Sequence, residues 1–436
     1  MTETSPCDAT IHAGLARGAE PSAPHEERPR LSQSVLNIDE KIRSNLFAWR
    51  GQFSPQLVEA HLAAYAKPGE IVLDPFVGSG TVLVECARRG NPALGAEINP
   101  AAAIMARTYE ASAVPVAERV RILGNLTRDI LLLANHEDLP LFHERTRPGL
   151  AASLLESIAH HSPGTLERNL LETLAVMLDL QAGGPIPFSK LYSTWSDLRS
   201  LVEGLPHTTQ PISIALADAR QLPLEPHTVD FVLTSPPYIN VFNYHQQYRA
   251  SVEALRWRVL PLARAEIGSN RKHRGNRFLT VVQYCLDMAQ VLLELGRVCR
   301  RGARAIFVVG RESNVRKTAF YNGAILKHIA SDCLGFRVAL EQERVFQNRF
   351  GKQIYEDLLH LKLDSASSAS WENRVRRFAT DLLSDARSRA PEESRSDLDD
   401  ALHRVAEVKA SPIAKLQDQD EPLVAGFLHR LRETIP

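Results

Sequence analysis

The sequence predicts an α/β protein built on a mostly parallel, doubly wound sheet of the Rossmann-like kind. Short runs that are apolar at nearly every position alternate with amphipathic stretches, as in strands that are buried on both faces of a parallel sheet. The first helix is expected to begin at Pro55 with Ser54 as its N-cap, and a second is expected over 81–89. The expected strands are 71–73, 93–97, 212–217, 229–234 and 304–309.

The regions around these strands have a different character. Residues 105–208 contain Ala- and Leu-rich helical stretches and no alternating pattern, which indicates a helical insertion. Two extended stretches near the end, 337–345 and 355–363, predict an antiparallel hairpin at the edge of the sheet. Charged helices are expected over 371–389 and 397–431.

Composition limits the classes of function. Lys plus Arg and Asp plus Glu both number 51, so a nucleic-acid partner would have to bind a local cluster of basic residues. Five cysteines form no C-x-x-C pair, which favours a reduced, cytoplasmic setting. The N-terminus has no apolar signal region, no apolar run is long enough to span a membrane, and no histidine cluster has metal spacing. We therefore expect neither a membrane nor a metal.

The string DPFVGSGT, Asp74 to Thr81, follows one strand and opens one helix. Gly78 and Gly80 allow a sharp turn and the close approach of a ligand to the backbone. The string lacks the Lys of a phosphate-binding P-loop, and Leu83 stands where a dinucleotide fingerprint requires Gly or Ala. A lone G-S-G would fit an ordinary tight turn equally well, but the eight-residue string is more specific.

Two acids follow later strands at the edge where open α/β sheets bind ligands. Glu97 ends the next strand, where a carboxylate can accept both hydroxyls of a ribose. Asp218 follows the strand 212–217, where it can accept from the amino group of an adenine. A helix-cap acid and an ordinary turn acid are the alternatives for these two residues.

The string TSPPY, Thr234 to Tyr238, follows the strand 229–234. The exocyclic amine of a nucleobase is a weak nucleophile, and acceptors that fix its N–H bonds favour a pyramidal nitrogen. Ser235 Oγ and the Pro236 carbonyl are such acceptors, while Pro236 and Pro237 stiffen the loop and remove competing donors. Tyr238 offers an aromatic face for a base turned out of the helix. A rigid turn is the alternative for a lone S-P-P.

DPFVGSGT, AEINP and TSPPY together resemble the S-adenosylmethionine-dependent amino-methyltransferases that act on DNA, the N4-cytosine/N6-adenine class. The resemblance implies a Rossmann-like methyltransferase fold, S-adenosylmethionine as cofactor and duplex DNA as substrate. It covers about 42–110 and 212–363. The cofactor residues that we expect are Gln52, Ser54, Asp74, Pro75, Phe76, Gly78, Ser79, Gly80, Thr81, Glu97, Asn99 and Asp218. Gln52 and Ser54 lie in RGQFSP, which is similar to the family's segment that closes over the methionine end of the cofactor.

The resemblance also implies an organisation and a reaction. The catalytic residues would be Ser235, Pro236, Pro237 and Tyr238. A serine at the first position of this loop is typical of N4-cytosine members, although some such members methylate adenine, and many N4-cytosine members run in the opposite motif order. The C5-cytosine reaction is disfavoured because the single Pro-Cys, Pro6-Cys7, lies in the N-terminal segment. The predicted regions are a disordered segment (1–30), a cofactor half (31–110), a helical insertion and candidate target-recognition region (111–210), a catalytic half (211–365) and a charged helical tail (366–436).

Basic residues near the loop TSPPY, which is called the amine loop below, are candidates for DNA contact. The segment 264–277 holds five Arg or Lys against one Glu, and the segment 344–352 is basic and aromatic. A solvated basic loop and a polar turn are the alternatives. The candidates are Arg271, Lys272, Arg274, Arg277, Arg349 and Lys352. A cognate restriction nuclease is a candidate partner, and rival functions are N6-adenine methylation, RNA base methylation and non-catalytic DNA binding in a defence system.

The methyl-transfer functions among these require one spatial arrangement. The glycine-rich loop and the serine–proline–proline loop have to stand side by side at one edge of the sheet.

Overall fold

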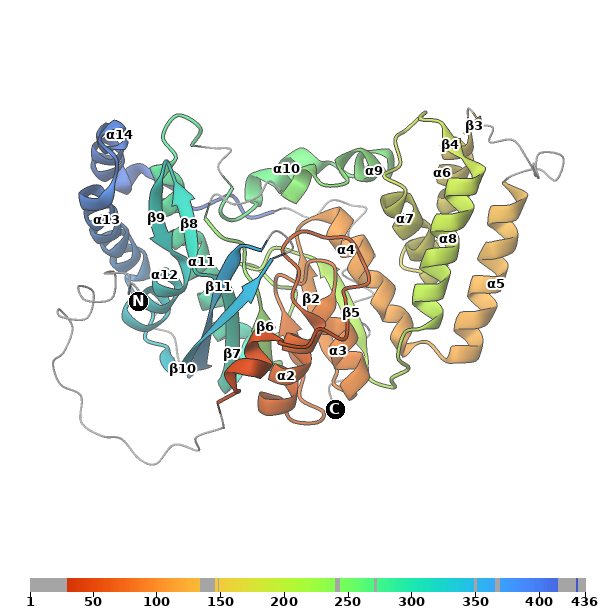
Figure 1. Cartoon of the computed structure of the whole chain (residues 1–436), viewed down its shortest axis with the longest axis horizontal. Coiled ribbons are helices and arrows are strands. Elements are labelled where there is room, and N and C mark those ends of the chain that lie inside the picture. The colour runs from red at the N-terminus through yellow and green to blue at the C-terminus, as the bar shows by residue number, and fades with distance from the viewer. Residues whose placement is uncertain are drawn as a thin grey trace. The chain divides into compact units, whose positions relative to one another are not determined.

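A seven-stranded sheet forms the centre of the computed structural model, which describes residues 30–133, 146–147, 149–239, 244–269, 273–348, 351–364, 369–414 and 429. The strand order is β10-β11-β7-β6-β1-β2-β5 (Figure 1). The strands are β1 (Val72–Asp74), β2 (Ala93–Glu97), β5 (Ile212–Leu216), β6 (Val229–Thr234), β7 (Cys299–Gly310), β10 (Arg337–Gln347) and β11 (Gln353–Leu363). The predicted disordered segment 1–30 lies outside the described residues except for Arg30.

The pairing confirms the predicted fold class. Neighbours from β7 through β6, β1 and β2 to β5 are parallel, whereas β11 runs antiparallel to both β7 and β10. The order reverses direction at β1, because β2 and β5 lie on one side of it and β6 and β7 on the other. Open sheets of this type bind ligands where the order reverses.

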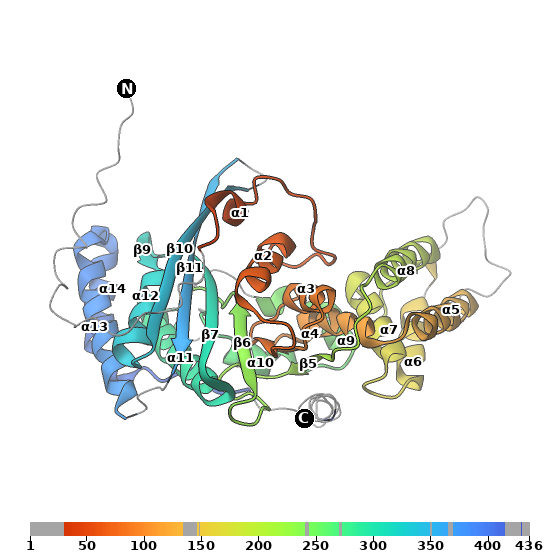
Figure 2. The same ribbon diagram turned by 90° about the horizontal axis from the view of Figure 1, so that it is seen from below.

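Helices cover both faces of this sheet (Figure 2). The helices α2 (Pro55–Tyr65), α3 (Thr81–Arg89) and α4 (Pro100–Arg107) pack on one face, while α11 (Phe278–Val298) and α12 (Asn322–His328) pack on the other. Successive side chains of a strand point to opposite faces of the sheet. Phe231 and Leu233 of β6 therefore pack in the core with α2, α3 and α4, and Val232 packs in the core with α11 and α12.

Among the described helices, α11 alone is long and apolar enough by composition to cross a membrane. Within its most apolar window, 83% is buried inside the protein. Its side chains pack between the sheet and α13 (Trp371–Arg389), which is the environment of a core helix.

The segment between β2 and β5 is helical, as the sequence predicts. After η1 (Thr108–Ala113) come α5 (Val116–Leu132), α6 (Leu150–His160), α7 (Leu166–Met177) and α8 (Phe188–Glu203), with the short strand pair β3 (Thr146–Arg147) and β4 (Ile186–Pro187). Figure 1 shows α5, α6, α7 and α8 grouped together beyond the β5 edge of the sheet. Buried Trp195 of α8 donates from Nε1 to Thr127 Oγ1 of α5 at 3.0 Å, which fixes these two helices to each other.

Several smaller elements connect these parts. They are α1 (Gln33–Asn37), η3 (Tyr244–Gln246), α9 (Arg249–Ala254), α10 (Val259–Ala265), β8 (Glu312–Val315), β9 (Thr318–Tyr321), η4 (Ile329–Cys333), α14 (Glu392–His403) and η5 (Val405–Glu407). The β8–β9 hairpin was not expected from the sequence.

The predicted helix over 397–431 is wrong at 408–414, whereas 415–428 and 430–431 lie outside the described residues and His429 is helical. The helix α14 ends at His403, and 408–414 has no helical structure. Its backbone instead satisfies buried charges, since Ser411 N donates to Asp287 Oδ1 at 2.7 Å and Ala414 N donates to Asp218 Oδ2 at 3.0 Å. A helix would use these N–H groups internally, so their bonds to the buried carboxylates disfavour a helix here.

Two buried histidines face each other between α2 and β11. The ring centroids of His61 and His360 are 6.0 Å apart, and the Nε2 atoms of both have no hydrogen-bond partner among the described residues. Arg304 donates to Nδ1 of His360 at 3.2 Å, which keeps that nitrogen an acceptor. Burial lowers the pKa of His61 to about 4 and that of His360 to about 2, so both rings are neutral in the folded protein.

This pair predicts a loss of stability in mild acid. The folded pKa values lie below the unfolded value of about 6.5, so the folded state binds fewer protons and stability is full above pH 6.5. As the pH falls from 6.5 towards 4, each histidine should cost at most about 1.4 kcal/mol of unfolding free energy per pH unit. Urea unfolding at pH 7, 6 and 5 should show a shallower decline in His360→Leu than in the wild type. Identical slopes would contradict the neutral assignment.

Candidate active site at the carboxyl edge of the sheet

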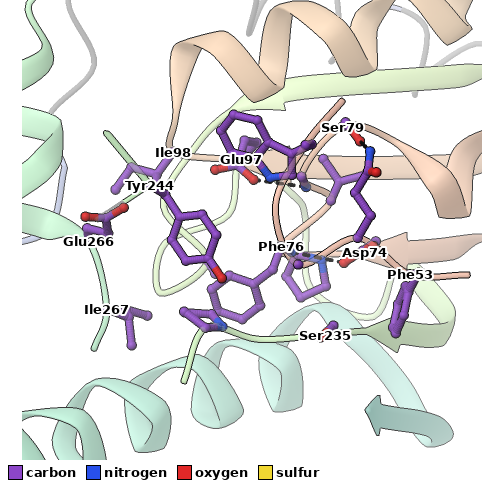
Figure 3. Close-up of a pocket in the computed structure, with 18 of the residues that line it drawn as sticks. Phe53, Asp74, Phe76, Ser79, Glu97, Ile98, Ser235, Tyr244, Glu266 and Ile267 are labelled. Carbon is purple, nitrogen blue, oxygen red and sulfur yellow. Dashed lines mark hydrogen bonds between the residues drawn. The ribbon is translucent and has the colours of Figure 1, made fainter. Parts of the chain in front are cut away.

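A pocket of about 860 Å³, its open mouth included, lies at the carboxyl ends of β1, β2, β5 and β6. Figure 3 shows side chains from several distant segments that converge on it. The lining residues are Trp49, Arg50, Gly51, Gln52, Phe53, Asp74, Pro75, Phe76, Val77, Gly78, Ser79, Thr81, Glu97, Ile98, Ala217, Asp218, Ala219, Ser235, Pro237, Tyr244, Ala265, Glu266 and Ile267.

The glycine-rich loop forms one wall of the pocket. Its backbone has a φ of +52° at Gly78 and +96° at Gly80, conformations that glycine adopts without strain. A Cβ on Gly80 would lie 2.5 Å from the ring of Tyr109, so this glycine also permits close packing behind the loop. The sequence argument for Gly78 and Gly80 as turn residues is consistent with this geometry, although Gly80 itself does not line the pocket.

Glu97 joins this loop to the end of β2. Its Oε2 accepts from Gly78 N at 3.0 Å and its Oε1 accepts from Asn99 N at 2.8 Å. A carboxylate has about four lone-pair positions, so Glu97 retains acceptor capacity for a ligand in the pocket. Burial raises the pKa of Glu97 to about 7, although three backbone N–H groups oppose the shift.

A second acid joins the two loops themselves. Thr234 Oγ1 at the end of β6 donates to Asp74 Oδ1 at 2.6 Å, and Phe76 N donates to the same oxygen at 3.1 Å. Because β1 and β6 are parallel neighbours, with Leu73 opposite Val232, the loops that follow them leave the same edge. This confirms the expected arrangement of the glycine-rich and serine–proline–proline loops. Burial raises the pKa of Asp74 to about 7.

In the amine loop, Ser235 and Pro237 line the pocket, whereas Pro236 is buried and Tyr238 lies behind the loop. The ring of Tyr238 packs on Gly310 of β7, where a Cβ would come within 3.0 Å of Cε2. Its hydroxyl lies 3.2 Å from Ser235 Oγ. Burial raises the pKa of Tyr238 to about 12, so the hydroxyl stays protonated. Tyr238 therefore orients Ser235, and its ring is not part of the pocket lining, contrary to the expectation of a stacking face.

The segment 47–53 contacts the glycine-rich loop. Gln52 Nε2 bonds to Ser79 Oγ and donates to Phe47 O at 2.9 Å. Trp49 packs against Gly78 and stacks on Tyr244 with ring centroids 6.2 Å apart. The residues that follow the amine loop thus hold the segment that covers the cofactor loop.

The remaining expected residues lie elsewhere. Ser54 is the N-cap of α2 and borders a separate surface depression, and Asn99 Oδ1 accepts from Ala101 N at 2.9 Å as the cap of α4. Among the DNA-contact candidates, Arg274, Arg277 and Lys352 are exposed. Arg271, Lys272 and Arg349 lie outside the described residues.

Sequence reasoning missed Glu266 and Ile267, which line the pocket. They lie far along the chain from Tyr238, and no local pattern marked them. Ile98 could have been found, because it directly follows Glu97 at the end of a strand.

The arrangement fits S-adenosylmethionine, the cofactor that the resemblance implies. Gly78 and Gly80 leave room at the backbone, Glu97 has free acceptor capacity, and the apolar side chains of Ile98 and Ile267 line the same cavity. The structure supplies, in one pocket, acceptors for hydroxyl groups and apolar surface for a purine.

Comparison with known proteins agrees with these features over part of the chain. Residues 23–107 match the family model described as DNA methylase, for N6 and N4 methyltransferases. The Type II methyltransferase M.MjaII of Methanocaldococcus jannaschii is 43% identical over 72 residues, which are 16% of this chain and 14% of that protein. The Type II methyltransferase M.Cfr9I of Citrobacter freundii is 46% identical over 71 residues, 16% of this chain and 23% of that protein.

Each of these matches spans less than a quarter of the relative's length. A solved SAM-dependent methyltransferase from Methanosarcina mazei aligns with 70% of this chain and 97% of its own, at 12% identity and a TM-score of 0.33. The strand order of the sheet, and not this likeness, identifies the fold. Over residues 23–107, which include the glycine-rich loop and Glu97, the chain matches the DNA methylase family of the N6/N4 amino-methyltransferase class.

Proposed function

We propose that this protein transfers a methyl group from S-adenosylmethionine to an exocyclic amine of a base in duplex DNA, with cytosine N4 as the leading target. The observation that carries the proposal is the convergence of the glycine-rich loop, Glu97 and Ser235 on one pocket. A methyl donor and a nucleophilic nitrogen have to meet in line, and positioning of this kind can supply much of the rate enhancement.

The residues have distinct roles in this proposal. Glu97 would accept from the ribose hydroxyls, and the glycine-rich loop, covered by Gln52 and Trp49, would hold the rest of the cofactor. S-adenosylmethionine supplies an electrophilic methyl group when bound. Ser235 Oγ, oriented by the Tyr238 hydroxyl 3.2 Å away, would accept an N–H of the target amine and favour a pyramidal nitrogen.

The substrate assignment rests on the family match and on charge. We propose that exposed Arg274, Arg277 and Lys352 contact phosphates and that the base is flipped out of the duplex into the pocket. Residues 111–210, which include helices α5 to α8, are the candidate target-recognition region. We propose a restriction–modification setting, which agrees with the Type II names of the relatives, together with a cognate nuclease and a cytoplasmic location.

The choice of cytosine N4 over adenine N6 rests on Ser235 at the first position of the amine loop. The purified chain should be incubated with duplex DNA and, separately, with total RNA, in the presence of methyl-labelled S-adenosylmethionine. After digestion to nucleosides we expect the label in N4-methylcytosine from DNA. Label in N6-methyladenine would change the assigned target base to adenine, and label in RNA alone would change the assigned substrate to RNA. Label in 5-methylcytosine would refute amine methylation.

Removal of the Ser235 hydroxyl should abolish most of the methyl transfer without loss of cofactor binding. Loss of one preorganised hydrogen-bonding group at a reacting centre can cost about 10² to 10³ in kcat, as for oxyanion-hole donors. We expect Ser235→Ala to show a reduction of this order in single-turnover methylation, with an unchanged dissociation constant for S-adenosylhomocysteine. The matched control is Ser384→Ala at an exposed position of α13. Full activity of Ser235→Ala would remove the assigned role.

A further inference from the structure

Asp218, the acid expected to bind the cofactor's adenine, has no acceptor capacity left. Arg220 donates to Oδ1 from its backbone N at 3.0 Å and from Nε at 2.9 Å. Arg220 Nη2 and Ala414 N donate to Oδ2 at 2.6 and 3.0 Å. A carboxylate offers about four lone-pair positions, so four donors saturate it.

These donors are fixed in place by a fully buried network. Arg220 Nη1 also donates to Asp287 Oδ1 at 3.0 Å and to Ser411 O at 2.8 Å. The Arg220 side chain has no exposed surface, so release of Asp218 towards a ligand would leave a buried guanidinium with fewer partners. Asp218 is therefore a structural residue that supports the pocket wall.

Another carboxylate lies beside this wall. Arg220 Nη2 donates to Ala265 O at 3.2 Å, which places the next residue, Glu266, next to the Asp218 network. Glu266 is 7% exposed and lines the same pocket as Glu97 and Asp218. Figure 3 shows Glu266 on the side of the pocket that carries Ile98 and Ile267, away from Asp74 and Phe53.

The side chain of Glu266 is held on one oxygen. His245 Nδ1 lies 2.9 Å from Glu266 Oε2, and both residues are buried. An ionised carboxylate only accepts, so His245 donates from Nδ1 in this pair. No hydrogen bond from a described residue reaches Oε1, which leaves this oxygen as an acceptor for a ligand in the pocket.

We propose that Glu266, oriented by His245, accepts the hydrogen bond from the amino group at C6 of the cofactor purine. This inference rests on the proposed function and assigns one contact within it. The location of Glu266 supports the proposal. The purine would lie next to the ribose that Glu97 binds, near Ile98 and the Asp218 network. Because Ala265 is bonded to that network, Glu266 lies at this end of the pocket. Ser235, at the amine end, lies on a different wall in Figure 3.

The chemistry of the pocket supports the same assignment. The charge of Glu266 acts on Glu97 and contributes to the raised pKa of that acid. Two carboxylates that face one cavity repel each other unless donors or positive charge lie between them. A purine amine, ribose hydroxyls and a sulfonium provide these partners together.

The test changes both partners of the proposed hydrogen bond. On the ligand, the 6-amino donor is replaced by a 6-oxo acceptor, and on the protein, the Glu266 carboxylate is replaced by an amide that can donate. Binding of S-adenosylhomocysteine and of S-inosylhomocysteine, whose purine has a 6-oxo group, should be measured by calorimetry on the full chain. The wild type should prefer the 6-amino ligand. Glu266→Gln, whose amide can donate to the 6-oxo group, should reduce this preference by about tenfold or more, since a mispaired buried polar group costs about 1–3 kcal/mol.

Two further variants keep the result interpretable. Glu253→Gln, an exposed glutamate on α9, is the matched control and should retain the wild-type preference. Glu266→Asp should bind the 6-amino ligand more weakly than the wild type does but still prefer it to the 6-oxo ligand. This variant tests the proposal if Glu266→Gln does not fold. Thermal melting of each variant checks folding.

If folded Glu266→Gln keeps the wild-type preference for the 6-amino ligand, the inference is overturned. This holds even if the variant has lost methylation, because Glu266 would then act on the target base and not on the cofactor purine. A wild type that binds neither ligand would instead refute the proposed function itself. A preference that collapses in Glu266→Gln and persists in Glu253→Gln supports the assignment.

Discussion

The hydrogen bond between Thr234 and Asp74 is the constraint on which the site depends. It joins the last residue of β6 to the last residue of β1, and each of these residues begins one of the two motifs that carry the chemistry. Asp74 is buried, which raises its pKa, and this donor and the N–H of Phe76 oppose that shift by stabilising the carboxylate. The parallel pairing of β1 and β6 brings the two loops to one edge, and this bond fixes their relative position.

Around this bond, each wall of the pocket is held by residues from another part of the chain. Trp49 lies on Gly78 and is stacked on Tyr244, so the covering segment is held by residues from beyond the amine loop. The tail contributes as well, because Ala414 N completes the shell of Asp218 from nearly 200 residues away. The family match ends at residue 107, whereas nine of the 23 residues that line the pocket come from later segments. The proposed activity therefore depends on parts of the chain that the match does not cover.

Local signals were sufficient for the sheet and for the two motifs. Strands that are buried on both faces are apolar throughout, and glycine or proline at fixed positions marks the loops after them, so β2, β5 and β6 were found from pattern alone. The side-chain roles were harder to predict. Tyr238 turns away from the pocket because Gly310, far along the chain, leaves room for its ring. The carboxylate of Asp218 accepts hydrogen bonds from Arg220, two residues later, and from Ala414 in the tail, which leaves no acceptor for a ligand.

The same reason explains what was missed. Glu266 stands in a stretch without periodicity, and only the fold brings it to Glu97. The absence of a helix over 408–414 could not be predicted from its composition, because it follows from contacts with the buried charges of Arg220 and Asp287. Tertiary contacts of this kind override local propensity.

The central claim is that one ligand touches both loops. Hydrogen–deuterium exchange of the full chain should be measured with and without S-adenosylhomocysteine, in peptides that cover 74–81 and 229–239. The account predicts slower exchange in both peptides and in one that covers 47–53, with no change in α13. Protection of the glycine-rich loop while 47–53 and 229–239 exchange as in the free protein would contradict it.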